Sequence, residues 1–155
     1  MVALCRRAGH GIRRCLQRAV KRDMAFILLI EDEPNLLRAI ARMIRADGHD
    51  VAEARGGREG LRLLDNGPEI IVTDILMPTT DGIEIMAANR ALRRPAKLIA
   101  MTGALPRGGM DYLTIARSLG ADATLRKPFR RADIQAAIEK CWSGSRSVEG
   151  RTEAA

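Results

Sequence analysis

Several residues that could perform chemistry each follow a short apolar run of the sequence. Glu31 and Asp32 follow residues 26–30, Asp74 follows residues 70–73, Thr102 follows residues 97–101, and Lys127 follows residues 122–125. Three carboxylates gathered in one place would repel one another and raise one another's pKa values. A bound Mg²⁺ would remove that repulsion, since it takes a few carboxylates together with water or phosphate oxygens. These residue types therefore predict a magnesium site with Asp32 and Asp74 as direct ligands and Glu31 as a direct or water-mediated one.

A carboxylate beside such a cation could also attack phosphorus and form an aspartyl phosphate. We predict that Asp74 is this phosphoryl-accepting residue. Phosphoryl transfer depends mainly on alignment and on neutralising charge. The Lys127 ammonium could pair with Asp74 or with a phosphoryl oxygen, and the Thr102 hydroxyl could donate to a further oxygen.

These residues can act together only if the fold brings the ends of the apolar runs to one place. The sequence predicts strands at 26–30, 51–54, 70–73, 97–101 and 122–125, and helices at 34–47, 58–64, 83–92, 110–119 and 130–142. Strands that alternate with helices indicate an α/β fold with a parallel sheet. Right-handed crossovers place helices on both faces, and ligands of such sheets bind beyond the carboxyl ends of the strands.

Each motif also has a simpler explanation when it is considered alone. Residues 31–33 could form a solvated first turn of a helix, where the macrodipole favours acidic side chains. Asp74 could be a turn residue before Pro78, and Lys127 alone carries little information. Because all of them follow strands, in the order that places them at one sheet edge, we favour a shared site over separate structural roles.

The composition fits one domain with an aliphatic core, since 46% of the 155 residues are hydrophobic and only 3% are aromatic. No apolar run approaches the roughly 20 residues of a membrane span, and the N-terminus lacks the apolar core of a secretory signal. We therefore predict a cytoplasmic protein without membrane insertion. Cys5, Cys15 and Cys141 lack the spacing of metal ligands, and we predict that they are free thiols. We predict that His10 and His49 are incidental surface residues.

The net charge of +7 is concentrated at the N-terminus. Residues 1–23 hold seven basic residues and one acidic residue, whereas residues 24–155 hold 19 and 18. Two explanations stay open. The segment could lie upstream of the native start at Met24, which we favour, or it could be a functional basic arm that binds nucleic acid or an acidic surface.

Residues 26–142 resemble the receiver domain of two-component response regulators. The motifs are LIEDE at 29–33, TDILMP at 73–78 with DG at 81–82, MTG at 101–103, and KPF at 127–129. The resemblance implies a flavodoxin-like fold, with a five-stranded sheet in the order 2-1-3-4-5 and helices on both faces. It implies a receiver domain at 24–142, between the basic arm at 1–23 and a disordered polar tail at 143–155.

The resemblance further implies that Asp74 is phosphorylated by a sensor histidine kinase or a histidine phosphotransfer protein. It implies that the backbone carbonyl of Leu76 is a further Mg²⁺ ligand, and that the Lys127–Pro128 peptide bond is cis. In the family, the threonine at the position of Thr102 moves toward the phosphoryl group while an aromatic residue swings inward. Thr124 stands at the aromatic position here, so that switch cannot operate, and we expect the loop at 103–109 to carry part of the motion.

We therefore predict a single-domain response regulator, a switch and not an enzyme, which docks an unknown protein partner or relays its phosphoryl group. Only 13 residues follow Trp142, too few for an output domain. A phosphatase of the haloacid dehalogenase type would need an aspartate two residues after its nucleophile, where Leu76 stands. A P-loop motif is also absent from the sequence. Leu76 and Ala104 carry no charge and offer no route to fast water-assisted hydrolysis.

Overall fold

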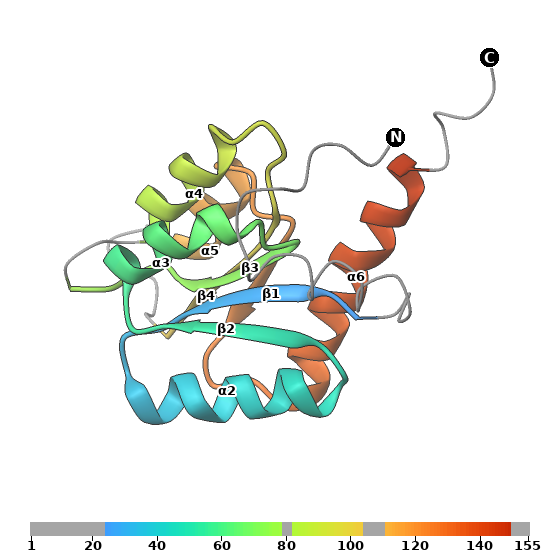
Figure 1. Cartoon of the computed structure of the whole chain (residues 1–155). Coiled ribbons are helices and arrows are strands. Elements are labelled where there is room, and N and C mark those ends of the chain that lie inside the picture. The colour runs from blue at the N-terminus through green and yellow to red at the C-terminus, as the bar shows by residue number, and fades with distance from the viewer. Residues whose placement is uncertain (1–23, 79–81, 104–110, 150–155) are drawn as a thin grey trace, which may run out of the picture.

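The computed structural model describes residues 24–78, 82–103 and 111–149 (Figure 1). Its elements in chain order are β1 (Phe26–Ile30), α2 (Pro34–Ala46), β2 (Asp50–Ala54), α3 (Gly57–Leu63), the 3₁₀ turn η1 (Leu64–Asn66), β3 (Ile70–Asp74), α4 (Gly82–Arg90), β4 (Lys97–Thr102), α5 (Tyr112–Ser118), β5 (Ala123–Arg126) and α6 (Arg131–Glu149). The five strands form one parallel sheet in the order β2-β1-β3-β4-β5. The predicted flavodoxin-like strand order is therefore confirmed.

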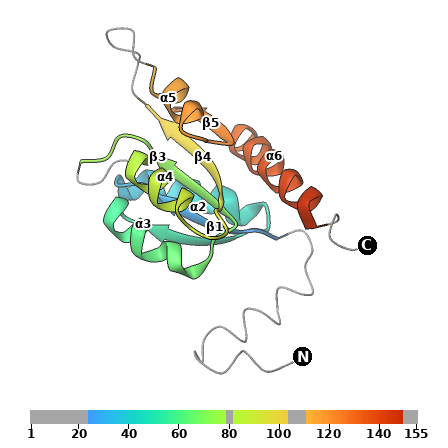
Figure 2. The ribbon, with the colours of Figure 1, turned by 90° about the horizontal axis from the view of Figure 1, so that it is seen from above.

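Helices cover both faces of the sheet, as the two orthogonal views show (Figures 1 and 2). On one face α2 and α6 pack against the sheet, and on the other face α3, α4 and α5 do so. All five residues of β1 are buried, as expected for a strand covered on both sides. Its alternate side chains enter opposite cores, with Ile27 and Leu29 in the first and Leu28 and Ile30 in the second.

The turn after β1 is fixed by a cap on α2. The Glu33 carboxylate accepts hydrogen bonds from the backbone N–H groups of Asn35 (3.0 Å) and Leu36 (2.6 Å), which would otherwise lack intrahelical partners. These hydrogen bonds lower the pKa of the Glu33 carboxyl. Pro34 occupies the first helical turn, where its missing N–H costs nothing. The cap therefore holds the start of α2 directly behind Glu31 and Asp32.

The last helix is longer than predicted. α6 continues to Glu149, although we expected it to end at Trp142 and a disordered tail to begin at residue 143. The extension contains no proline and only one glycine, Gly144, which costs about 1 kcal/mol in a helix and can be tolerated there. Residues 150–155, the basic arm at 1–23 and the loop residues 104–110 lie outside the described part of the chain. Among the described helices, none is both long enough and apolar enough to cross a membrane.

His49 is not the incidental surface residue that we predicted. It is half-buried, and its Nδ1 accepts a hydrogen bond from the backbone N–H of Ala25 at 3.2 Å. Burial lowers the pKa of His49, although Asp47 and Glu139 oppose that shift. The sequence carried no sign of this contact, because it joins the start of β1 to the start of β2 across the sheet.

The lowered pKa of His49 predicts that the protein becomes less stable in acid. Since its pKa is lower in the folded chain, the unfolded chain binds a proton more readily, and the free energy of unfolding should fall as the pH drops below about 6.5. The variant His49→Asn keeps an acceptor near Nδ1 but does not titrate, so part of this pH dependence should disappear. Denaturant titrations of both proteins on either side of that pH measure the difference, and identical pH profiles would contradict the prediction.

Candidate functional site

The candidate site lies at the carboxyl edge of the sheet, where backbone hydrogen bonds continue just beyond the strands. The N–H of Glu31 donates to the carbonyl of Ala54 at 3.1 Å, and the N–H of Lys127 donates to the carbonyl of Thr102 at 2.8 Å. Asp74 is the last residue of β3 and pairs with Met101 of β4. The residues before each functional side chain are thus fixed by the sheet itself.

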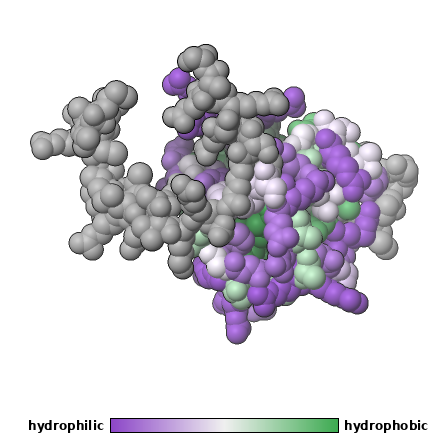
Figure 3. Space-filling model, turned by 90° about the vertical axis from the view of Figure 1, so that its right-hand side faces the viewer, coloured by the Kyte–Doolittle hydropathy of each residue, from purple (hydrophilic) through white to green (hydrophobic). Residues whose placement is uncertain are grey.

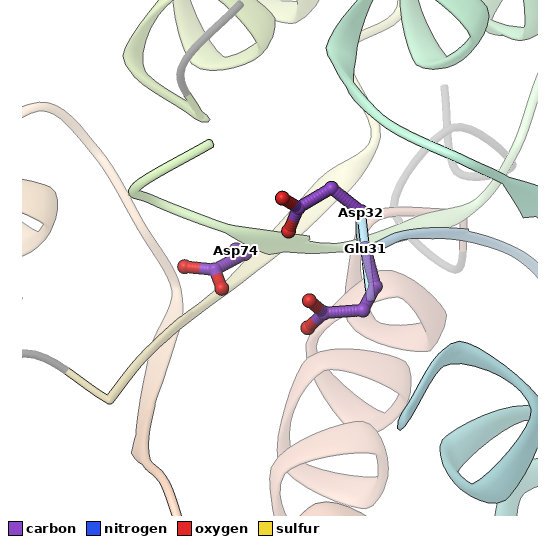
Figure 4. A group of neighbouring side chains, drawn as sticks. All are labelled: Glu31, Asp32 and Asp74. Carbon is purple, nitrogen blue, oxygen red and sulfur yellow. The ribbon is translucent and has the colours of Figure 1, made fainter. Parts of the chain in front are cut away.

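The three predicted carboxylates come together at this edge, as Figure 4 shows. One carboxylate oxygen each from Glu31, Asp32 and Asp74 lie within 4.8 Å of one another. Glu31 and Asp74 are 1% and 6% exposed, while Asp32 is exposed to solvent. The acidic run therefore has divided roles, since Glu31 and Asp32 face the site and Glu33 caps the helix. All three cluster members offer the hard oxygen atoms that Mg²⁺ prefers.

Lys127 bridges the two buried carboxylates. Its Nζ donates to Oε2 of Glu31 at 2.5 Å and to Oδ2 of Asp74. The Lys127 side chain is only 15% exposed. Burial opposes its charge, but the hydrogen bonds to Asp74 and Glu31 outweigh burial and raise the pKa of Lys127. The residue is therefore an ammonium at neutral pH and supplies the positive charge nearest to Asp74 among the described side chains.

The pKa of Glu31 is raised as well, and for a carboxyl group this favours the neutral form. Burial raises the pKa of the Glu31 carboxyl, and the nearby Asp74 adds to that rise, while Lys127 offsets part of it. The buried part of the site thus holds two carboxyl groups, those of Glu31 and Asp74, and the ammonium of Lys127. The Lys127–Pro128 peptide bond is cis, as the resemblance to receiver domains implies.

Thr102 and Leu76 lie beside this group. Thr102 ends β4 and is 1% exposed. The backbone N–H of Leu76 donates to Oδ1 of Asp74 at 3.0 Å, so Asp74 has one oxygen held by Leu76 and the other held by Lys127. This arrangement fixes the orientation of the carboxylate that we predict to be the phosphoryl acceptor.

Gly82 has a role that the sequence motif alone did not reveal. Its N–H donates to the carbonyl of Ile75 at 2.8 Å. A Cβ atom at this position would lie 2.3 Å from the carbonyl oxygen of Asp74 and 2.8 Å from Cα of Ile75. Both neighbours are backbone atoms that cannot rotate away. The glycine in the DG motif at 81–82 therefore permits the start of α4 to contact the backbone of Asp74.

Replacing Gly82 with alanine should destabilise the protein, because the new methyl group would force the backbone of Asp74 or α4 to move. We expect the free energy of unfolding to fall by about 1–3 kcal/mol, the usual cost of overpacking. Gly103→Ala is the matched control, since a Cβ atom there would meet Lys127 at an ordinary 3.7 Å. Denaturant titration of both variants gives the comparison, and equal stability of the two would contradict the proposed close approach.

Thr124, at the position where the resemblance to receiver domains implies an aromatic residue, joins β5 to α5. Its Oγ1 accepts a hydrogen bond from Nη2 of Arg117 at 2.7 Å. Nearby, Arg126 forms an ion pair of 3.1 Å with Asp111, whose carboxylate caps α5. Polar contacts thus connect this helix to the sheet at the position of the missing aromatic side chain. Most of the loop that we expected to carry the motion lies outside the described residues.

Comparison with known proteins agrees with this geometry. The family model for the response regulator receiver domain matches residues 27–139. The chain therefore belongs to the receiver-domain family of two-component response regulators. The transcriptional regulatory protein PdtaR of Mycobacterium tuberculosis is 35% identical over 124 residues, which are 79% of this chain and 58% of PdtaR. PrrA of Mycobacterium bovis is 32% identical over 114 residues, 73% of this chain and 48% of PrrA.

The chain spans about half the length of these curated relatives. Solved structures cover the domain more fully. A receiver domain protein from Clostridium thermocellum matches with a TM-score of 0.73 and 29% identity, covering 80% of this chain and 98% of its own. TrrA from Thermotoga maritima, solved in complex with Mg²⁺-BeF, matches with a TM-score of 0.67 and 26% identity, covering 76% and 99%. The family establishes a signalling role in two-component systems.

Proposed function

We propose that Asp74 is the phosphoryl acceptor of this receiver domain, and that it receives the group from a phosphohistidine of a sensor histidine kinase or a histidine phosphotransfer protein. The observation that supports this most is the buried Asp74 carboxylate, held by Lys127 on one oxygen and by Leu76 on the other. In the transfer, an Asp74 oxygen forms a bond to phosphorus while the P–N bond of the donor breaks. The imidazole keeps the electron pair of that bond and takes up a proton.

The residues of the site fit a Mg²⁺ ion, since three carboxylate oxygens lie within 4.8 Å of one another. Two of the carboxylates are buried, and among the described side chains only Lys127 forms ion pairs with them. We propose that Asp32, Asp74, the Leu76 carbonyl and, directly or through water, Glu31 hold it. A bound Mg²⁺ would supply positive charge that offsets the repulsion between these carboxylates and the incoming phosphoryl group.

The chain's own residues supply the remaining interactions in this proposal. Lys127 keeps its ammonium beside Asp74 through the hydrogen bond to Glu31, so it can pair with a phosphoryl oxygen without a large movement. Thr102, at the end of the neighbouring strand, donates its hydroxyl to another phosphoryl oxygen. Both groups stabilise charge on the phosphoryl group, which is the main task of a protein in this reaction.

The proposal is tested by the mass of the intact protein after incubation with acetyl phosphate. With Mg²⁺ we expect a gain of one phosphoryl group, and with EDTA in place of the metal we expect none. Absence of the gain in the presence of Mg²⁺ would overturn the assignment. An equal gain in EDTA would overturn the metal requirement and leave the acceptor role to be judged from Asp74 variants.

The role of the phosphorylated domain is part of the same proposal. The domain docks an unknown protein partner or passes the group to a histidine phosphotransfer protein, and it turns over no separate substrate. The receiver domain at 24–142 acts in the cytoplasm, flanked by the arm at 1–23 and the segment at 143–155. Incubation of radiolabelled, phosphorylated protein with a histidine phosphotransfer protein distinguishes the two roles, because only a relay loses its label to that partner.

A further inference from the structure

A small set of polar and charged residues is buried within the described part of the chain. Its members are Glu31, Thr73, Asp74, Asn89 and Thr102. Glu31, Asp74 and Thr102 belong to the candidate site, and the Asn89 side chain bonds the backbone of Ala96. Thr73 belongs to neither arrangement, although it directly precedes the proposed phosphoryl acceptor.

The surroundings of the Thr73 side chain are apolar. Hydrophilic side chains dominate the described surface that is visible in Figure 3, around smaller apolar areas, whereas Thr73 is a polar residue with 0% exposure. Its neighbours across the sheet are Ile30 of β1 and Ala100 of β4, and both belong to the core under α3, α4 and α5. A hydroxyl buried in such a place is costly unless it forms a hydrogen bond.

The Thr73 hydroxyl bonds the backbone of the next residue. Its Oγ1 donates to the carbonyl oxygen of Asp74 at 2.9 Å. In the same peptide group, the N–H of Ile75 donates to the carbonyl of Met101 at 2.9 Å. The start of α4 packs against the Asp74 carbonyl, because a Cβ atom at Gly82 would lie 2.3 Å from its oxygen. The peptide group between Asp74 and Ile75 is therefore held at both its C=O and its N–H.

The orientation of this peptide group affects the contacts of the Asp74 carboxylate. A planar peptide can turn only about the soft dihedrals on its two sides. The next N–H along the chain, that of Leu76, donates to Oδ1 of Asp74 at 3.0 Å. Rotation of the peptide between Asp74 and Ile75 would move the Leu76 N–H away from Oδ1. The carboxylate would then keep its hydrogen bond to Lys127 but lose the one that orients its other oxygen.

We propose that Thr73 is a positioning residue for phosphoryl transfer to Asp74. Its hydroxyl fixes the peptide group between Asp74 and Ile75, and this in turn keeps the Leu76 N–H on Oδ1 of the carboxylate. The hydroxyl contacts the backbone of Asp74 and not the reacting oxygen atoms, so it acts through alignment, on which phosphoryl transfer depends. This inference rests on the proposed acceptor role of Asp74.

Two variants of the full-length protein separate the hydroxyl of Thr73 from its methyl group. Thr73→Val keeps the branched shape and loses the hydroxyl, whereas Thr73→Ser keeps the hydroxyl and loses the methyl. If Thr73 served only to fill the core, Thr73→Ser would be the more harmful change, because it leaves a space in the core. A positioning role predicts the opposite order, with Thr73→Val the more harmful change for phosphorylation.

The hydrogen bond itself can be tested by NMR without any phosphoryl donor. Labelling aspartate carbonyls with ¹³C and isoleucine amides with ¹⁵N selects two peptide bonds of the chain, Asp74–Ile75 and Asp133–Ile134. In Thr73→Val the Asp74 carbonyl signal should move upfield, and in Thr73→Ser it should stay near its wild-type position. The Asp133 signal comes from α6 and should not move in either variant, which shows that both are folded. An Asp74 signal that does not move in Thr73→Val would overturn the proposal.

The effect on the reaction is measured from the initial rate of mass gain with acetyl phosphate and saturating Mg²⁺. Thr73→Val should be slower than the wild type by about tenfold or more, since a misplacement of about 1 Å can cost about 10²-fold. Thr73→Ser should react at nearly the wild-type rate. A wild-type rate in Thr73→Val, or an equal loss in both variants, would overturn the role of Thr73 alone. Absence of any gain in the wild type would instead defeat the acceptor role of Asp74, on which the inference rests.

Discussion

Asp74→Asn is expected to abolish the gain of a phosphoryl group when the protein is incubated with acetyl phosphate and Mg²⁺. An amide has no anionic oxygen to attack phosphorus, whereas the wild-type carboxylate is buried and oriented by Leu76 and Lys127. Asparagine keeps the shape of the side chain and an oxygen that can accept from the Leu76 N–H. The loss should therefore reflect the missing nucleophile, and intact-protein mass spectrometry measures it directly.

The matched control is Asp65→Asn, which changes an exposed aspartate in the η1 turn and should leave the mass gain at its wild-type level. A denaturant titration of Asp74→Asn completes the comparison, because a folded variant that is not phosphorylated separates loss of chemistry from loss of structure. A mass gain in Asp74→Asn equal to that of the wild type would place the phosphoryl group on another residue and defeat the central proposal.

Much of the site could be predicted because its residues follow strands. The apolar run at 26–30 indicated a strand buried on both faces, and the parallel topology then required residues after different strands to meet at one edge. Glu31, Asp32 and Asp74 do meet there, with Lys127 between two of them. Residues far apart in the chain could thus be grouped without any knowledge of their distances. The roles of these residues in phosphorylation stay predictions.

Other features depend on tertiary packing and left no signal in the sequence. The side chain of Asn89 is buried and bonds both backbone groups of Ala96, each at 2.9 Å, which ties the end of α4 to the segment before β4. The contact of Gly82 with the backbone of Asp74 and that of His49 with Ala25 are of the same kind. Each joins elements whose relative position is fixed only when the sheet and its helices pack. Patterns of hydrophobicity specify the elements but not such individual contacts.

Lys127→Met should lower the stability of the protein and slow its phosphorylation. The substitution leaves Glu31 and Asp74, which are 1% and 6% exposed, without the ammonium that bonds both of them. Removing one partner of a buried ion pair costs about 3–5 kcal/mol, and the free energy of unfolding at neutral pH should fall by about this amount. Loss of one group that stabilises developing charge should also slow uptake from acetyl phosphate by about 10²–10³-fold.

The stability of the same variant should also depend on pH and on Mg²⁺, which a simple loss of packing would not cause. Lys127 offsets part of the rise in the pKa of Glu31, so its removal should raise that pKa further. A carboxyl with a raised pKa in the folded state binds protons more readily than in the unfolded chain, and the variant should therefore regain stability as the pH falls toward the ordinary value of about 4.3. At neutral pH, Mg²⁺ should stabilise the variant more than the wild type, because it meets two carboxylates without a counter-charge.

Lys140→Met is the matched control. It makes the same change of residue type and charge, but Lys140 is exposed on α6. Denaturant titrations of both variants, with Mg²⁺ and with EDTA, measure stability, and timed mass spectra measure phosphorylation. Equal stability of Lys127→Met and Lys140→Met would contradict the inference that Lys127 balances the buried carboxylates. A Lys127→Met protein that is destabilised yet phosphorylated at the wild-type rate would restrict Lys127 to the structure of the site and exclude it from the transfer itself.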